Sequence, residues 1–275
     1  MARGVTRLNL MVKGWMAKGA NLWRREQQVV YLVTGQASYT YGTDNITTVA
    51  DTNETTLDAA EAASQTVLSV TSTSGFANSD VIGIKLDDGT IDFTTISSFV
   101  TNDTVTVATG LTSAAASGNN VYTYTTKATS PTKILFAYRR DPSDIDTPVA
   151  LRSRDEYSNQ TLKSTTGVIT EVHHDRQLTS KLFVWPTGEK SLDKLILIAD
   201  RYTEDFDAVA NTPDYPAEWM NALVWGLSSE LSNVYGLPLQ ERAFLKSCAE
   251  QEFNEANTYD VEGSHIQFQY ARDDG

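Results

Sequence analysis

Cysteine and histidine, two side chains that commonly hold metal ions, are scarce in this sequence. The 275 residues include one cysteine, Cys248, and three histidines. A single cysteine excludes a disulfide within one chain and a cysteine metal cluster. His173 and His174 are adjacent in a segment with strand character, where neighbouring side chains point to opposite faces. A metal site needs more ligands at suitable spacing, so we interpret the pair as the polar end of a strand and expect no metal and no cofactor.

Long apolar runs are also missing. No segment approaches the ~20 consecutive apolar residues that a membrane-spanning helix needs. The N-terminal segment "LNLMVKGWMAKGANLW" is basic, but Lys13 and Lys18 interrupt it. A secretory signal has an unbroken apolar stretch and a small-residue cleavage site. We therefore expect a protein that is made and folded in a cytoplasm and has no membrane partner.

Positive charge is sparse and unevenly placed. The chain has 22 Lys and Arg against 35 Asp and Glu, a net charge of -13. A general nucleic-acid binder is basic, so that class is disfavoured for the surface as a whole. Residues 43–127 contain ten acidic and two basic side chains, whereas the first 25 residues contain six basic side chains and no acidic one. Those six are Arg3, Arg7, Lys13, Lys18, Arg24 and Arg25.

The basic N-terminal segment has three interpretations, which the sequence leaves open. It is an ordinary solvated helix face, it docks on an acidic partner, or it lines a passage for DNA and contacts phosphates without reading bases. Trp15, Trp23 and Tyr31 lie near these charges in the chain. Aromatic residues and arginine are enriched in protein–protein interfaces, so this segment is predicted to contact other subunits or a DNA channel.

No catalytic motif is present. The chain has neither the phosphate-binding pattern G-x-x-x-x-G-K nor a dinucleotide fingerprint. Cys248 falls on an apolar helix face, where a small buried cysteine is the usual case. The acidic pairs Asp87–Asp88 and Glu204–Asp205 would need to converge across a cleft to serve a glycosidase, and the sequence does not show this. "DDG" at Asp87–Gly89 is typical of a hairpin turn and lacks the further ligands of a calcium loop. We expect no catalytic residue and no enzyme.

Helical periodicity appears at the two ends of the chain. Val5–Trp23 has apolar residues near a 3.6-residue period. In "PDYPAEWMNALVWGLSSELSNVYGLP", Pro216 suits a first helical turn, and Gly236 suits the left-handed residue that ends a helix. A second helix follows from about Leu239 to Asn257, and the short turn makes the two antiparallel neighbours. The side chains expected to pack these helices are Trp219, Leu223, Leu227, Leu231, Leu245 and Phe253.

Strand periodicity fills the middle. Residues 43–127 are rich in Thr, Ser, Ala, Asn and Asp, with short period-two segments such as "DVIGIKL", "DTVTVAT" and "NVYTYTT" between turn signals. That pattern predicts a small all-β sandwich or barrel, and the change of composition at both ends predicts an insertion. Host strands are expected on either side, as in "QQVVYLVTG", "KILFAYRR" and "DKLILIADRY". The predicted divisions are 1–42 with 128–257 as host core, 43–127 as insertion, and 258–275 as a terminal arm.

The arm alternates apolar Ile266, Phe268 and Tyr270 with Gln267 and Gln269. A lone strand is not stable in water, so the pattern requires a sheet edge or a groove. Two interpretations remain open: a strand that returns to its own domain, or one that pairs with a partner protein. The candidate binding residues are Ser264, His265, Ile266, Gln267, Phe268, Gln269 and Tyr270.

Several of these segments together resemble a known family. The segments are "LVTGQASYTYG", "LFVWPTG" followed by "LILIADRYTEDFD", and the helical hairpin with its "YPAEW…AL…L…L…YG.P" pattern. In this order they resemble the head-to-tail adaptor, or tail accessory factor, of short-tailed double-stranded DNA phages. The resemblance covers about residues 5–42 and 133–257. It rests on the spacing of common residues, and no catalytic signature contributes to it.

The resemblance implies an α+β fold: a helical-bundle adaptor core with a small β-sheet, carrying the inserted all-β domain and the extended C-terminal arm. It also implies a dodecameric ring below the portal protein, in the neck of a virion assembled in a bacterial cytoplasm. Double-stranded DNA passes through such a ring without sequence recognition. Ser264–Tyr270 would bind the portal. The insertion at 43–127 departs from the basic family pattern and would meet a tail nozzle, tail tube or tail fibre.

Two alternatives are kept. The first is a tail-associated peptidoglycan hydrolase or polysaccharide-binding tail protein, because the insertion is β-rich like many sugar-binding domains. The second is another virion part, such as a tail tube or capsid decoration protein.

Overall fold

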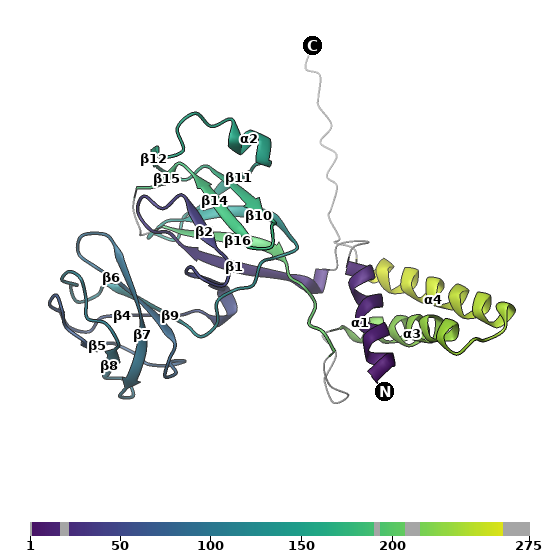
Figure 1. Cartoon of the computed structure of the whole chain (residues 1–275). Coiled ribbons are helices and arrows are strands. Elements are labelled where there is room, and N and C mark those ends of the chain that lie inside the picture. The colour runs from purple at the N-terminus through teal and green to yellow at the C-terminus, as the bar shows by residue number, and fades with distance from the viewer. Residues whose placement is uncertain (1, 17–21, 190–192, 207–214, 261–275) are drawn as a thin grey trace, which may run out of the picture. The chain divides into compact units, whose positions relative to one another are not determined.

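The computed structural model of the chain describes residues 2–16, 22–189, 193–206 and 215–260 (Figure 1). The chain forms two compact units, and each is described by itself. Met1–Arg25 and Tyr202–Gly275 belong to the first, which we name the helical unit. Glu26–Arg201 forms the second, which we name the β unit. The domain boundaries expected from composition remain predictions.

The larger sheet of the β unit has eight strands in the order β2-β14-β13-β11-β10-β16-β1-β3. Its strands are β1 (Arg25–Tyr31), β2 (Ser38–Thr40), β3 (Ile46–Thr48), β10 (Lys133–Arg140), β11 (Asp146–Leu151), β13 (Glu171–Asp175), β14 (Lys181–Trp185) and β16 (Lys194–Asp200). β10 pairs antiparallel with β11 and β16, whereas β11 and β13 are parallel. Because side chains alternate along a strand, one face collects the core, which includes Val30, Ala137, Leu182, Leu195 and Leu197.

A β-bulge in β10 sets which side chains face away from this core. The register of its pairing with β16 shifts between Ile134 and Phe136. The extra residue allows both Ile134 and Ala137 to lie in the core. Phe136 is 45% exposed, and Tyr138 belongs to a separate apolar cluster. The outer face of β10 is therefore aromatic.

A second sheet of the β unit closes into a barrel. Its strands are β4 (Asn53–Thr56), β5 (Val67–Ser69), β6 (Val81–Lys85), β7 (Ile91–Phe99), β8 (Thr104–Val107) and β9 (Asn120–Tyr124). The order is β4-β9-β6-β7-β8-β5. The end of β4 meets the end of β5 through an antiparallel bridge between Leu57 and Val70, and the Thr71 amide donates to the Thr56 carbonyl at 3.0 Å. Closure removes the unpaired sheet edges that invite aggregation.

The turn predicted at Asp87–Gly89 is confirmed. It joins β6 to β7, and Gly89 has φ +86, a conformation that favours glycine. The Asp88 carboxylate accepts hydrogen bonds from the backbone amide and the hydroxyl of Thr90, at 2.9 and 2.6 Å. These bonds lower the pKa of Asp88. Within the described residues, no group of three or more His, Cys, Asp or Glu side chains could hold a metal ion.

An aromatic cluster joins the barrel to the larger sheet. The ring of Tyr31, on β1, is fully buried and lies 5.1 Å from that of Tyr122 and 6.1 Å from that of Tyr124, both on β9. Phe93 of β7 lies 5.6 Å away. Gly83 leaves room for Phe93, since a Cβ at Gly83 would lie 2.5 Å from its Cε1 atom. Burial raises the pKa of all three tyrosines, so they stay neutral.

Smaller elements complete the β unit. A short helix, α2 (Arg154–Ser158), follows β11. A capping box begins it: the Ser153 amide donates to Glu156 Oε2 at 2.8 Å, and the Glu156 amide donates to Ser153 Oγ at 3.3 Å. β12 (Thr166–Gly167) pairs in parallel with β15 (Thr187–Gly188). A 3-10 turn, η2 (Val49–Asp51), leads from β3 to β4.

The helical unit contains α1 (Ala2–Met16), α3 (Met220–Val234) and α4 (Leu239–Tyr259), with 3-10 turns η1 (Leu22–Arg24) and η3 (Ala217–Trp219). Figure 1 shows α3 and α4 side by side as a hairpin, with α1 against it. Gly236 has φ +65. The predicted left-handed end of the helix is therefore confirmed. No helix of the described residues is long and apolar enough to cross a membrane.

The predicted fold class is wrong. We expected a helical-bundle core with a small sheet, whereas the described chain is mainly β-sheet and the eight-stranded sheet is larger than the barrel. The helices described are four, and α2 has only five residues. Many of the strands have a signal in the sequence, but the pairing of β1, β10 and β16 joins distant parts of the chain. The predicted arm, 258–275, falls almost wholly outside the described residues.

Candidate assembly interface in the helical unit

An aromatic cluster forms the centre of the helical unit. The ring centroids of Trp15 and Trp219 are 5.9 Å apart, and that of Phe253 lies 5.1 Å from the first and 5.6 Å from the second. The three side chains come from α1, η3 and α4. Tilted and edge-to-face rings at these distances add to the stability gained from burial. The cluster therefore fixes three elements that are distant in the sequence.

Glycine allows α1 to approach α3 closely. A Cβ built on Gly226 would lie 2.6 Å from Met11 Sδ and 2.9 Å from Trp15 Cζ2. Such contacts are shorter than real Cβ atoms make, so a larger side chain would push the helices apart. By contrast, a Cβ built on Gly14 of α1 would have no atom within 4 Å. The contact glycine therefore lies on α3.

Polar contacts hold the segment that follows β16 against α1. Asn9 Nδ2 donates to the Phe206 carbonyl at 3.0 Å, and the Phe206 amide donates to Asn9 Oδ1 at 2.8 Å. Lys13 Nζ lies 2.9 Å from Asp205 Oδ2. No sequence signal identified Asn9, because the period of α1 was read from its apolar residues. The reciprocal amide pair fixes the register of the segment on the helix.

The outer surface of the three helices carries many large apolar side chains. Val224 is 62% exposed and Phe244 is 63% exposed. We name the exposed set the apolar surface: Leu10, Met220, Val224, Tyr235, Leu239, Phe244 and Tyr259. On α3, Met220 and Val224 continue through the half-buried Leu227 and Leu231 at helical spacing. A helix with apolar residues on both the inner and the outer face is typical of one that packs on a further partner.

The helices also differ in charge. α1 carries Arg3, Arg7 and Lys13 and no acidic residue. α4 carries four glutamates, Glu241, Glu250, Glu252 and Glu255, against two basic residues. Among the described residues, Arg7 lies 3.9 Å from Glu230, Lys246 lies 3.8 Å from Glu250 within α4, and Lys13 is paired with Asp205. Exposed pairs of this kind contribute about 0–1 kcal/mol each to stability, so the charges hold the helices together only weakly.

The residues predicted to pack the helices occupy different depths. Trp219 and Leu223 are buried, and Phe253 packs against the aromatic cluster. Leu227, Leu231 and Leu245 are half-buried. Ala222 and Ala256 are more fully buried than these leucines. Sequence reasoning passed over Ala222, because a small side chain contributes little to an apolar stripe.

The six basic residues at the N-terminus are not equivalent. Arg3 and Arg7 are exposed and line a surface hollow with Thr6 and Val234. Arg24 is 2% exposed and Arg25 is half-buried, so neither presents an open charge. Lys18 lies outside the described residues, as do Ser264–Tyr270 of the predicted portal-binding arm.

In the β unit, a histidine and a serine lie at the distance found in catalytic sites. His174 Nε2 lies 2.9 Å from Ser180 Oγ, the geometry of a nucleophile and its base. Ser180 is buried, donates to the Asp175 carbonyl at 3.2 Å and also contacts Ser130 Oγ at 2.8 Å. Its proton is already used, and no substrate reaches it. Burial lowers the pKa of His174 to about 4, so the pair is a neutral structural network.

His173, its neighbour, has a structural place too. Its Nδ1 atom lies 3.0 Å from the Arg152 carbonyl, and its ring stacks on Tyr157 at 5.7 Å. Cys248 is half-buried on α4.

Comparisons with known proteins leave the chain without an assigned family. No family model matches the sequence, and no curated protein matches it. Among solved structures, VP17, a capsid protein of bacteriophage P23-77, aligns with 67% of this chain and 77% of its own. The identity is 10% and the TM-score is 0.13. A TM-score this low does not show a common fold, so the match carries no argument about this chain.

Proposed function

We propose that the chain is a non-enzymatic structural subunit of a bacteriophage virion, a head-to-tail adaptor that forms a ring below the portal. The observation that carries the proposal is the apolar surface of the helical unit. The resemblance of the sequence segments to the adaptor family supports it independently. The corrected fold removes the expected helical-bundle core from the argument, but the helices that carry the resemblance remain.

The apolar surface calls for a protein partner. Six large apolar side chains on three helices, with Tyr235 in the turn between α3 and α4, exceed the scattered exposure that is ordinary for a soluble monomer. Interfaces between permanently associated subunits resemble a protein core cut in half. The proposed partner is a second copy of this chain, because neighbouring subunits of a ring present the same apolar surface to one another.

The charges favour contact between unlike faces. The basic α1 of one copy complements the acidic α4 of the next. A contact between two different faces is heterologous and repeats around a ring when the rotation closes. The family resemblance implies twelve copies, with double-stranded DNA passing through the channel.

Further partners follow from the resemblance alone. The portal protein would bind Ser264–Tyr270 by strand addition. The barrel, which carries most of the acidic residues of 43–127, would face a tail nozzle, tail tube or tail fibre and would stay away from the DNA. In this proposal the protein belongs to the virion neck and takes part in genome ejection.

A matched pair of variants tests the proposal. Val224 belongs to the apolar surface at 62% exposed, and Val168 is 52% exposed in the β unit. Val224→Asp places a charge in the proposed contact, and we expect it to shift purified protein from rings to monomers. Val168→Asp should assemble as the parent does. Sedimentation velocity and negative-stain microscopy measure the outcome, with and without purified portal rings.

The result that would overturn the proposal is also specific. The parent chain must form rings either alone or on the portal. A parent that remains a monomer in both settings, or a Val224→Asp protein that assembles as fully as Val168→Asp, contradicts it. Circular dichroism of each variant confirms that the fold is retained.

A further inference from the structure

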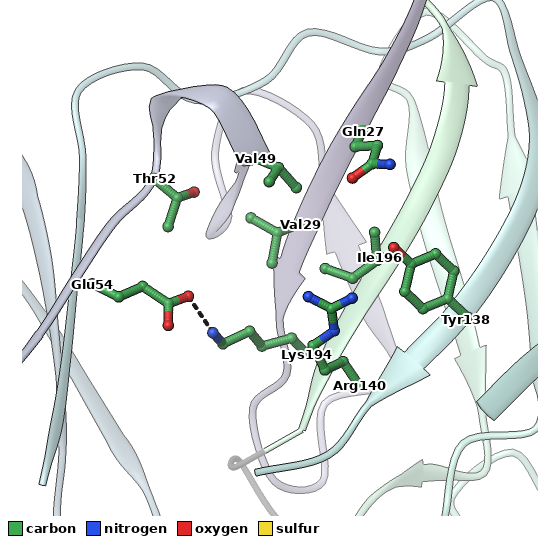
Figure 2. Close-up of a pocket in the computed structure, with 9 residues that line it drawn as sticks. All are labelled: Gln27, Val29, Val49, Thr52, Glu54, Tyr138, Arg140, Lys194 and Ile196. Carbon is green, nitrogen blue, oxygen red and sulfur yellow. Dashed lines mark hydrogen bonds and ion pairs between the residues drawn. The ribbon is translucent and has the colours of Figure 1, made fainter. Parts of the chain in front are cut away.

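The β unit contains a cleft that the ring function does not use. It has a volume of about 340 Å³ and lies where the larger sheet meets the barrel (Figure 2). β1, β16 and β10 form one side, and the segment from η2 to β4 forms the other. The volume falls within the range of about 300–1,000 Å³ that is usual for small-ligand sites.

The period of the strands creates the floor of the cleft. Val30, Leu195 and Leu197 belong to the core of the larger sheet. Val29 and Ile196, which precede or follow them in the chain, lie on the opposite face. The barrel covers this outer face at Tyr31 but leaves the neighbouring part of β10 open. Val29 and Ile196 are 3% and 4% exposed, so the cleft has a firm apolar base.

An aromatic strip extends the cleft along β10. The rings of Tyr138 and Phe136 lie 6.1 Å apart and are tilted by 39°. Tyr138 lines the cleft, and Phe136 is 45% exposed. Two neighbouring rings on one strand give an apolar platform wider than one ring, and it continues the cleft that Tyr138 lines. A ligand of more than one unit can contact both the platform and the cleft.

The charged groups at the cleft neutralise one another. Arg140 donates to both oxygens of Asp146, at 2.8 and 2.9 Å, and lowers the pKa of that carboxyl. Lys194 forms an ion pair with Glu54 and lies 4.4 Å above the ring of Tyr122. Figure 2 shows the ion pair spanning the cleft, with Glu54 on the side opposite Tyr138 and Arg140. Two cations and two anions leave no net charge to attract phosphate.

We propose that this cleft binds a neutral oligosaccharide. Sugar rings present apolar C–H faces that pack on aromatic rings, and hydroxyl groups that both donate and accept hydrogen bonds. Tyr138 and Phe136 supply the stacking surface. Gln27, Thr52 and the guanidinium N–H groups of Arg140 that do not face Asp146 supply hydrogen bonds.

The same residues argue against hydrolysis of the sugar. Glycosidases generally require two carboxyl groups on opposite sides of the scissile bond. Glu54 is the carboxylate among the described lining residues, and Lys194 engages it. The site therefore binds without turnover, which fits a virion part that attaches to a surface glycan.

The test is binding of defined oligosaccharides to the full chain. The probes are chitotetraose, cellotetraose and maltotetraose, measured by saturation-transfer NMR and by calorimetry. We expect at least one to bind saturably, and Tyr138→Ala to weaken it at least tenfold. Tyr138→Phe keeps the ring and should bind within about threefold of the parent, since stacking supplies most of the contact. Tyr202→Ala is the matched control, because Tyr202 is 58% exposed and lines neither the cleft nor the apolar surface.

Three results would overturn the inference: no saturable binding of any probe, equal binding by Tyr138→Ala and the parent, or loss of binding in Tyr202→Ala. A fourth is preferential binding of decathymidylate at physiological salt that Tyr138→Ala abolishes, which would assign an anionic ligand instead. The measurement is repeated on Val224→Asp protein. Sugar binding that survives in this variant separates the cleft from ring assembly.

Discussion

The two units of this chain differ in how they expose their large apolar side chains. The β unit closes its second sheet into a barrel and exposes large apolar side chains mostly one at a time, in turns such as those at Leu162 and Leu178. The smaller helical unit exposes six on its three helices, together with Tyr235 in the turn between α3 and α4 and Tyr202. Isolated exposed apolar residues are ordinary, whereas a group of them on packed helices is less so. The comparison indicates that the β unit is largely self-sufficient in its packing, whereas the helical unit leaves apolar side chains uncovered.

The strongest way to break the self-sufficient unit is to remove the aromatic junction between its sheets. Tyr31→Ala deletes a fully buried ring that contacts Phe93, Tyr122 and Tyr124. We expect a loss of about 3–5 kcal/mol in the free energy of unfolding, the range for deleting a large buried aromatic. Urea unfolding followed by far-ultraviolet circular dichroism measures it.

The helical unit should be spared in that experiment. Four of the five tryptophans, Trp15, Trp23, Trp219 and Trp225, belong to it, so tryptophan fluorescence reports mainly on the helices. We expect the fluorescence transition of Tyr31→Ala to stay near that of the parent. An equal shift of both signals would show that the two units unfold as one, contrary to the comparison.

Acid should weaken the β unit through His174. Burial holds its pKa at about 4 in the folded chain, against an ordinary value of 6.5. As the pH falls from 6.5 to 4, the unfolded chain binds a proton that the folded chain does not, so stability is lost over that interval. The full shift would correspond to about 3 kcal/mol, and because the ring is only partly buried, solvent screening makes the loss smaller than that. His174→Gln should lose less stability than the parent between pH 7 and pH 4.5 in chemical denaturation. Equal losses would contradict the assignment.

The smallest effect concerns the contact between α1 and α3. Gly226→Ala places a methyl group against Met11 and Trp15 and should cost about 1–3 kcal/mol, as overpacking does. Gly14→Ala is the matched control, because its methyl meets no atom within 4 Å and alanine favours the helix by up to about 1 kcal/mol. Fluorescence-detected unfolding should move in opposite directions for the two variants. Movement in the same direction would argue against close packing at Gly226.

Local structure was largely predictable from the sequence. Period-two segments marked β6 and β9, the segments "KILFAYRR" and "DKLILIADRY" marked β10 and β16, and Asp87–Gly89 and Gly236 marked a turn and a helix end. These features depend on neighbours in the chain. The size of the larger sheet was not predictable, because its strand order and the parallel pair β11–β13 depend on contacts between distant residues.

The apolar surface and the cleft also differ in how far the sequence could predict them. Apolar residues of α3 could be read from the sequence, but which of them face outward depends on where α1 and α4 pack. The cleft was invisible, since Glu54 and Lys194 are separated by 140 positions and meet only when the barrel folds against the sheet. The bulge that leaves Phe136 exposed has no sequence signal of its own.

The way the chain enters and leaves the barrel has an evolutionary consequence. β4 and β9, its first and last strands, are antiparallel partners, with Asn53 opposite Thr123. The amide of Thr126 donates to Asp51 at 2.6 Å, so the incoming and outgoing chains remain neighbours beyond the strands. Evolution could replace the barrel by another domain, or by a short loop, without changing the strand order of the larger sheet. The barrel can thus diverge in sequence while the larger sheet that carries it stays the same.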